Sequence, residues 1–145
     1  MVDPEDTKEP FGSYRDALQK VLDNYIIKYN DLNFAQRFNI TTGYNIQWYP
    51  IGGGFKANHT ENNGIIDNSS RVLVFMTYLN DVPDGGSYFK AQDLEVKAEK
   101  GLTLIWPAGI THYHKGIVSN TSEKMIITGW YDYVDLYLYT RRNNE

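Results

Sequence analysis

Near the start of the chain, apolar residues recur at the spacing of a helix. Five apolar side chains there lie three or four residues apart, namely Leu18, Val21, Leu22, Tyr25 and Ile26. This stripe predicts an amphipathic helix over residues 13–29. Residues 1–12 hold two prolines and four acidic residues with little apolar content, so we expect a loose leader there.

After an Asn-rich stretch the pattern changes to that of β-strands. Residues 44–49 alternate in polarity and end at a proline, which is typical of a half-buried strand. Residues 71–79 form an uninterrupted β-branched, aromatic and aliphatic run, as in a strand that is buried on both faces. Further strands are expected at 87–90, 94–98, 102–106 and 124–133, with Pro83-Asp84-Gly85-Gly86 as a turn before the first of them. One helix followed by several short strands predicts a mainly β fold, a sandwich or jelly roll, and not a parallel α/β fold.

Composition narrows the class of protein. A chain of 145 residues fits one domain, which we expect to span residues 13–145. The absence of cysteine excludes disulfide scaffolds, iron–sulfur clusters and cysteine nucleophiles. A net charge of -4 argues against a broad nucleic-acid-binding face. The sequence has no apolar run of membrane-spanning length and its N-terminus lacks the signal-peptide pattern, so we expect a cytoplasmic protein without a membrane partner.

The few histidines supply the main chemical signal. In an extended segment, side chains two residues apart point the same way, so His59 and Glu61 can bind one ion. A third ligand would come from His112 or His114, the other two histidines of the chain. Two histidines and one carboxylate are the ligand set of non-haem Fe(II) oxygenases, which leaves open positions on the metal.

Several short motifs surround these residues in a fixed order. They are Tyr49-Pro50, His59-Thr60-Glu61, Arg71, Tyr78-Leu79-Asn80-Asp81, Gly85-Gly86, Ile105-Trp106-Pro107, His114-Lys115-Gly116 and Lys124. In this order, residues 44–133 resemble the catalytic domain of 2-oxoglutarate/Fe(II)-dependent dioxygenases, specifically the prolyl 4-hydroxylase group. The resemblance implies a double-stranded β-helix (jelly roll) with the N-terminal helix packed on the sheet. It also implies hydroxylation with O2 and 2-oxoglutarate, which gives succinate and CO2.

The resemblance also implies a ligand set for Fe(II), formed by His59, Glu61 and His114. The family has a basic residue about ten positions after its distal histidine, and Lys124 stands in that relation to His114, whereas the residue ten positions after His112 is a serine. His114 also precedes a glycine by two positions, as in the family pattern. One departure is Glu61, where the family usually has the shorter Asp.

Roles for the co-substrate and the substrate follow from the same resemblance. Lys124 is expected to pair with the far carboxylate of 2-oxoglutarate, and Tyr78 and Tyr49 occupy positions that contact this co-substrate. Thr128 and Trp130 alternate with Lys124 along one strand and are expected to form the floor of the pocket. Arg71 is expected at the substrate entrance, and the loops 52–70 and 80–92 are expected to surround it. Ascorbate is a further candidate cofactor.

The substrate that best fits the resemblance is a prolyl residue in a peptide or protein. A free amino acid or another small molecule is a second reading of the same site. Two rivals come from other classes: a non-oxidative, cupin-like enzyme with Zn²⁺ or Mn²⁺ on the same ligands, and a non-enzymatic jelly-roll binding module. The cupin-like alternative assigns no role to Lys124, whereas the oxygenase uses it to bind 2-oxoglutarate.

Overall fold

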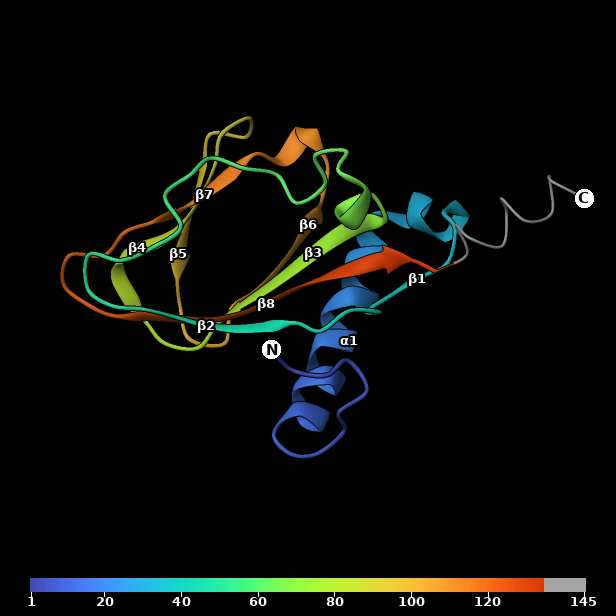
Figure 1. Cartoon of the computed structure of the whole chain (residues 1–145), viewed down its shortest axis with the longest axis horizontal. Coiled ribbons are helices and arrows are strands. Elements are labelled where there is room, and N and C mark those ends of the chain that lie inside the picture. Colours follow the sequence, from blue (N-terminus) through green and yellow to red (C-terminus); the bar gives the residue numbers. More distant parts are fainter. Residues whose placement is uncertain (135–145) are drawn as a thin grey trace, which may run out of the picture.

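The computed structural model describes residues 1–134 and consists of two antiparallel β-sheets and an N-terminal helix (Figure 1). The helical elements are α1 (Phe11–Lys28) and three short 3-10 turns, η1 (Asn30–Phe34), η2 (Ile66–Asn68) and η3 (Ile110–His112). The strands are β1 (Phe38–Asn39), β2 (Asn45–Tyr49), β3 (Arg71–Tyr78), β4 (Val82–Phe89), β5 (Leu94–Ala98), β6 (Thr103–Pro107), β7 (His114–Ile117) and β8 (Lys124–Tyr133). The predicted domain runs to residue 145, and its part after residue 134 lies outside the described residues.

The order of the strands in space differs from their order in the chain. The larger sheet has the order β1-β8-β3-β6, with β2 also paired to β8, and the smaller sheet has the order β5-β4-β7. Every strand pairing is antiparallel. Two facing antiparallel sheets with this interleaved order form a jelly roll, so the predicted mainly β fold is confirmed.

β3 is buried on both of its faces. Leu73 and Phe75 belong to a core cluster that also contains Leu18 and Leu22 of α1, whereas Val74 and Met76 belong to the cluster between the two sheets. Successive side chains of a strand point to opposite faces, so one strand takes part in both cores. This arrangement explains the uninterrupted apolar run of residues 71–79, and it places the helix against the larger sheet (Figure 1).

The structure differs from the predicted loose leader at Val2. The backbone of Val2 pairs with that of Tyr44 through two hydrogen bonds, and its side chain is buried in the core beneath α1. A single apolar side chain gives no periodic pattern, which is why the sequence did not indicate this contact. The helix itself begins at Phe11, two residues before the predicted start, and ends at Lys28.

The smaller sheet also differs from its prediction. Pro83-Asp84-Gly85-Gly86 was expected to be a turn before a short strand at 87–90, but it lies inside β4, which is eight residues long. The register of β4 with β5 shifts between Val82 and Gly86, so the residues typical of a turn here form an irregularity within a strand. β7 was not predicted at all, and it carries His114.

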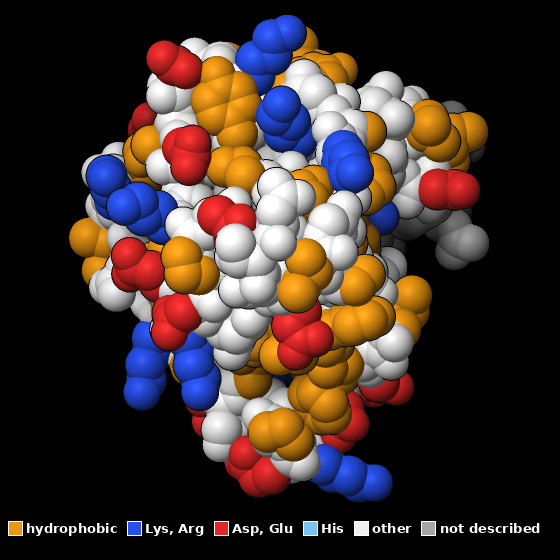
Figure 2. Space-filling model, turned by 90° about the vertical axis from the view of Figure 1, so that its left-hand side faces the viewer, with side chains coloured by type: hydrophobic (Ala, Val, Ile, Leu, Met, Phe, Trp, Pro, Cys, Tyr) orange, Lys and Arg blue, Asp and Glu red, His pale blue; other side chains and the backbone are white. Residues whose placement is uncertain are grey.

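On the face drawn in Figure 2, neither acidic nor basic side chains predominate. This face lies at the left-hand end of Figure 1, and acidic, basic and apolar side chains are interspersed on it. Within the described residues, no helix has the length and apolarity that a bilayer crossing requires.

Candidate metal centre

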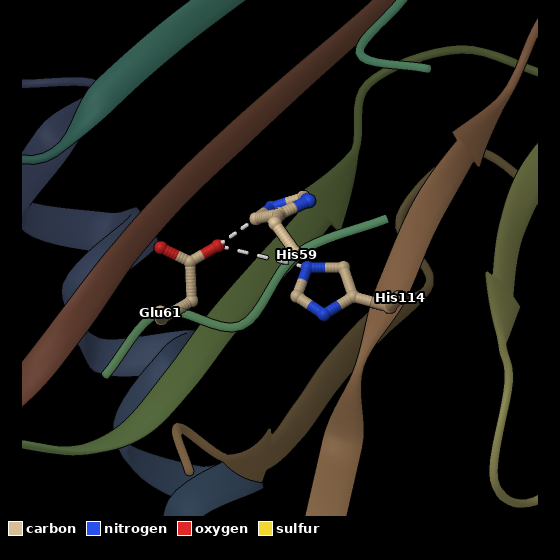
Figure 3. Close-up of side chains that lie close together, drawn as sticks. All are labelled: His59, Glu61 and His114. Carbon is tan, nitrogen blue, oxygen red and sulfur yellow. Dashed lines mark hydrogen bonds and ion pairs between the residues drawn. The ribbon is translucent and has the colours of Figure 1, made fainter. Parts of the chain in front are cut away.

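The segment that carries His59 and Glu61 is fixed by its backbone and by the residue between them. His59 and His114 form an isolated antiparallel bridge, in which the N–H of each donates to the carbonyl oxygen of the other at 2.9 Å. The hydroxyl of the buried Thr60 lies 2.6 Å and 2.7 Å from the carbonyl oxygens of Ala108 and Gly109, which share its one proton. Since Thr60 faces the other way, His59 and Glu61 point to the same side, as their spacing predicted (Figure 3).

Three side chains converge on one point (Figure 3). The Nε2 atom of His59 lies 3.0 Å from Oε1 of Glu61, and Nε2 of His114 lies 3.6 Å from the same oxygen. One ligand atom from each of the three side chains lies within 4.8 Å of the others. They are close enough for a single ion to bind all three, and imidazole nitrogen with carboxylate oxygen suits Fe(II).

Both histidines are oriented through their second ring nitrogen. Nδ1 of His59 donates to the carbonyl of Ala57 at 2.9 Å, and Nδ1 of His114 donates to the carbonyl of His112 at 3.0 Å. Because a carbonyl only accepts, Nδ1 carries a proton in each ring, and Nε2 is the nitrogen that faces the cluster and can bind a metal. Such outer hydrogen bonds are the usual way in which proteins fix metal-binding histidines.

His112 is not part of this cluster. It is the last residue of η3, its ring contacts the hydroxyl of Thr111, and its pKa is lowered by burial and by the nearby His114. The backbone is helical there and does not continue the strand, so His112 contributes its carbonyl oxygen to His114 and no side chain to the metal position.

Hydrogen bonds keep Glu61 ionised. Burial alone would raise its pKa, but the contacts from His114, His59 and Trp130 hold the pKa well below its ordinary value. For His59, burial alone would lower the pKa, and the hydrogen bond to Glu61 raises it above the ordinary value instead. The cluster therefore presents an anionic carboxylate between two imidazoles.

A cavity of about 210 Å³ opens beside the cluster and lies between the two sheets. Lys124 lines it and is 4% exposed, with Nζ donating to the carbonyl of Ile117 at 2.8 Å and that of Gly86 at 3.4 Å. Burial lowers the pKa of this lysine. Among residues 1–134, no carboxylate forms an ion pair with Lys124. A buried cation without an anionic partner suits an anionic ligand.

The other predicted co-substrate residues also line the cavity. Tyr78 shares a 2.8 Å hydrogen bond with Ser87, and the ring of Tyr49 lies 5.7 Å from Nζ of Lys124. Thr128 lines the cavity as well and donates its hydroxyl to the carbonyl of Phe75 at 3.1 Å. Burial raises the pKa of both tyrosines, so both keep their phenolic proton at neutral pH.

Trp130 and Arg71 make contacts that the sequence did not indicate. Trp130 lines the cavity, but its indole Nε1 donates to Oε2 of Glu61 at 2.8 Å, at the metal end of the cavity. Arg71 is not among the lining residues, and its guanidinium lies 3.7 Å from the centre of the Trp130 ring. The structure thus gives both side chains a contact that the motif order did not indicate.

Sequence reasoning assigned no individual role to several residues that line the cavity, although two of them, Phe55 and Ser87, lie in the segments expected around the entrance. These residues are Gln47, Phe55, Met76, Ser87, Trp106, Gly116 and Ile126. Gln47 could have been found, because it alternates with Tyr49 on the same strand. Trp106 matters for its chemistry: its ring packs against His114, and its buried indole N–H has no partner among the described residues. An unsatisfied buried donor in the wall of a cavity is suited to a polar ligand.

A jelly roll whose sheets enclose a His–carboxylate–His cluster and a buried lysine has the architecture of a non-haem iron oxygenase. Residues 44–132 match the model of the 2OG-Fe(II) oxygenase superfamily, which is more than half of the chain. The chain therefore belongs to this superfamily and is a 2-oxoglutarate/Fe(II)-dependent dioxygenase. No curated protein sequence matches it significantly.

Solved structures of prolyl hydroxylases share its fold. One is the viral collagen prolyl hydroxylase of Paramecium Bursaria Chlorella virus-1 in complex with 2OG, with a TM-score of 0.64, 18% identity, and 82% of this chain and 72% of that chain covered. A prolyl-4-hydroxylase of Pseudomonas putida has a TM-score of 0.62 and 20% identity over 92% of this chain and 70% of that one. A Phytophthora capsici prolyl 4-hydroxylase structure has a TM-score of 0.54 and 21% identity over 63% and 32%.

Proposed function

We propose that this dioxygenase hydroxylates prolyl residues in a peptide or protein. The observation that carries the proposal is one cavity lined both by a metal-binding cluster and by a buried lysine that has no carboxylate partner in the described residues. A dicarboxylate such as 2-oxoglutarate fits that pair of sites. One of its ends would reach the metal and the other would reach the lysine.

The residues present fit these groups. His59, Glu61 and His114 would hold Fe(II), and Lys124 would form a charge-assisted hydrogen bond with the far carboxylate of 2-oxoglutarate. Tyr78 lines the same cavity, and its hydroxyl supplies a further donor there. When bound, Fe(II) and 2-oxoglutarate would supply the oxidising chemistry by which O2, the co-substrate and a C–H bond of the substrate give the hydroxylated product, succinate and CO2. Ascorbate, as an accessory reductant, belongs to the same proposal.

The size of the cavity favours a substrate that binds at its mouth. A volume of about 210 Å³ suits a small diacid, and it is below the range of roughly 300–1,000 Å³ that is usual for pockets of larger ligands. Phe55 lines the cavity, is 51% exposed, and packs edge-on against His59 with 4.4 Å between ring centres. Exposed aromatic side chains are typical of surfaces that bind proline-rich segments.

The prolyl target also has support from the motifs and from the fold. Tyr78-Leu79-Asn80-Asp81 and Gly85-Gly86 resemble the prolyl 4-hydroxylase pattern. The similar structures from the Chlorella virus and from Pseudomonas putida are named as prolyl hydroxylases. Together with an exposed aromatic ring beside the metal cluster, these likenesses favour a prolyl residue over a free amino acid.

The test is a mass-spectrometric assay with proline-rich peptides. The protein is incubated in air with Fe(II), 2-oxoglutarate, ascorbate and a library of such peptides, and each peptide is paired with a version in which alanine replaces proline. We expect the mass of one oxygen atom to be added at proline, with one succinate formed per hydroxylation. The His112→Ala variant keeps this activity, whereas His114→Ala loses it. Succinate formation coupled to hydroxylation of free proline, with no peptide modified, would overturn the proposal.

A further inference from the structure

The two oxygens of the Glu61 carboxylate have separate partners. Oε1 faces both histidines, and Oε2 points away from them (Figure 3). Oε2 instead accepts the indole N–H of Trp130 at 2.8 Å, and it lies 3.5 Å from Nη1 of Arg71. Nη1 of Arg71 also donates to the backbone carbonyl of Glu61 at 3.2 Å. Oε1 is thus the oxygen that faces the metal position, and Oε2 is the oxygen that the surrounding protein binds.

Arg71 and Trp130 act on Glu61 as one unit. The guanidinium carbon of Arg71 lies over the Trp130 ring at 3.7 Å from its centre, so each group restrains the other. Arg71 begins β3 and Trp130 lies on β8, the strand paired with it, so the pair is mounted on the larger sheet. The side chain of Arg71 is 23% exposed and that of Glu61 is 14% exposed, so these contacts are partly shielded from water.

The length of the Glu61 side chain explains why its carboxylate needs to be held in place. Glutamate has one methylene more than aspartate and one more rotatable bond, so its carboxylate has more orientations to lose when it binds a metal. Two donors on Oε2 select one orientation before the metal arrives. They also occupy the lone pairs that a bidentate carboxylate would use.

We propose that Trp130 and Arg71 are positioning residues, which hold Oε2 of Glu61 so that only Oε1 is presented to the metal. This inference rests on the proposed metal site. It gives Arg71 a contact to a metal ligand in addition to its expected place at the substrate entrance, and it gives the indole N–H of Trp130 a role beyond lining the pocket.

The first test measures the affinity for Mn(II) without 2-oxoglutarate, by electron paramagnetic resonance of the free ion. Trp130→Phe removes the N–H and keeps an aromatic ring under Arg71. We expect the affinity to fall about 10- to 100-fold, as is usual when an outer hydrogen bond to a metal ligand is lost. The matched control is Trp48→Phe, because the indole of Trp48 donates to a carboxylate, Glu123, at the same distance of 2.8 Å but on the exposed side of β2.

Variants of Arg71 provide a second, independent readout. Arg71→Met removes the charge and the donors, and Arg71→Lys keeps the charge but loses the planar stacking group. We expect the Mn(II) affinity to fall for both, and to fall further for Met than for Lys. Thermal melting of each variant without metal is recorded beside the titration. This comparison separates a loss of metal affinity from a loss of the fold.

A double-mutant cycle with Glu61→Asp tests whether the two residues act through the length of the glutamate. Because aspartate is one methylene shorter, we expect its carboxylate not to reach the histidines with one oxygen and Trp130 with the other at the same time. We therefore expect Trp130→Phe to change Mn(II) affinity less in the Glu61→Asp background than in the wild type. Equal effects in both backgrounds, or an unchanged Mn(II) affinity in folded Trp130→Phe and Arg71→Met, would overturn the inference.

The outcome is distinguishable from a failure of the proposed function. Metal affinity is measured without co-substrate or substrate, so it does not depend on hydroxylation. A wild-type protein that binds Mn(II) and responds to these variants, but hydroxylates no peptide, would leave the positioning role intact and refute the prolyl hydroxylase. Peptide hydroxylation, together with a metal affinity that these variants leave unchanged, would support the prolyl hydroxylase and refute the positioning role.

Discussion

His59 and His114 are joined twice, once through their backbones and once through a shared neighbour. Each backbone N–H donates to the other's carbonyl at 2.9 Å, and both side chains reach Oε1 of Glu61. The bridge ties the long segment before β3 to β7. A metal ion that binds both side chains would reinforce the same connection, so metal binding and folding are expected to be coupled.

We predict that Mn(II) raises the melting temperature of the protein. At a free concentration of a hundred times its Kd, a ligand that binds only the folded state adds about 2.7 kcal/mol to the free energy of unfolding. Differential scanning calorimetry with and without Mn(II) measures the shift. The shift should disappear in His114→Ala and persist in His112→Ala, whose side chain lies outside the cluster. A shift of equal size in both variants would place the ion elsewhere.

The affinity for 2-oxoglutarate should fall as the pH rises. Burial lowers the pKa of Lys124 below the ordinary 10.5, and only the charged form pairs with a carboxylate. The affinity is therefore full below this lowered pKa and is lost as the pH passes through it. Isothermal titration of the Mn(II) protein at increasing pH measures the effect. Lys124→Arg, whose side chain stays charged, should bind with little change over that range, and a fall of the same size in this variant would exclude Lys124 as its cause.

Replacing Lys124 should stabilise the protein while it abolishes co-substrate binding. Because the pKa of Lys124 is lower in the folded state than in the unfolded chain, the charged lysine opposes folding at neutral pH. Stability from this group rises as the pH increases from the lowered pKa towards 10.5. We expect Lys124→Met to gain about 1 kcal/mol in unfolding free energy at pH 7 and to lose that pH dependence. Urea unfolding at pH 7 and pH 10 tests this, and a destabilised Lys124→Met would contradict it.

Much of the fold could be predicted because its signals are local. The apolar run in β3 marks a strand buried on both faces, and the spacing of His59 and Glu61 correctly indicated side chains that point the same way. The prediction of a turn before Ser87 was wrong, because an irregularity within a strand uses the same glycine-rich residues as a turn. Val2 was missed because one buried side chain has no period.

The parts of the site that the sequence did not indicate depend on contacts between strands. His112 and His114 are two residues apart, as are His59 and Glu61, but their side chains do not share a face. A 3-10 turn ends at His112 and the strand starts only at His114. The stacking of Arg71 on Trp130 joins two paired strands that are far apart in sequence. Such a pairing requires the sheet register, which the amino-acid pattern alone does not contain.

Tyr78→Phe should weaken 2-oxoglutarate binding with a small loss of stability. The hydroxyl of Tyr78 on β3 meets that of Ser87 on β4 at 2.8 Å, and it links the two sheets inside the cavity. Its removal leaves Ser87 without this partner, at a cost of about 1 kcal/mol in unfolding free energy. Ser87→Ala removes the same bond but keeps the phenol in the cavity. If the phenol contacts the co-substrate, the affinity falls more in Tyr78→Phe than in Ser87→Ala, and equal losses would argue for a purely structural bond.

Gly86→Ala should disrupt the smaller sheet and the lysine position together. Gly86 has a φ of +135°, which only glycine adopts readily, and a Cβ there would clash with the backbone carbonyl of Val96. Its own carbonyl accepts the 3.4 Å hydrogen bond from Lys124, so any shift of this backbone moves the partner of the lysine. We expect a loss of about 3 kcal/mol in unfolding free energy, since a clash and backbone strain combine.

The control is Gly109→Ala, where the φ is -83° and no atom beyond the neighbouring residues lies within 4 Å of the added carbon. A Gly86→Ala protein as stable as Gly109→Ala, with wild-type 2-oxoglutarate affinity, would show that β4 adopts another conformation at this glycine.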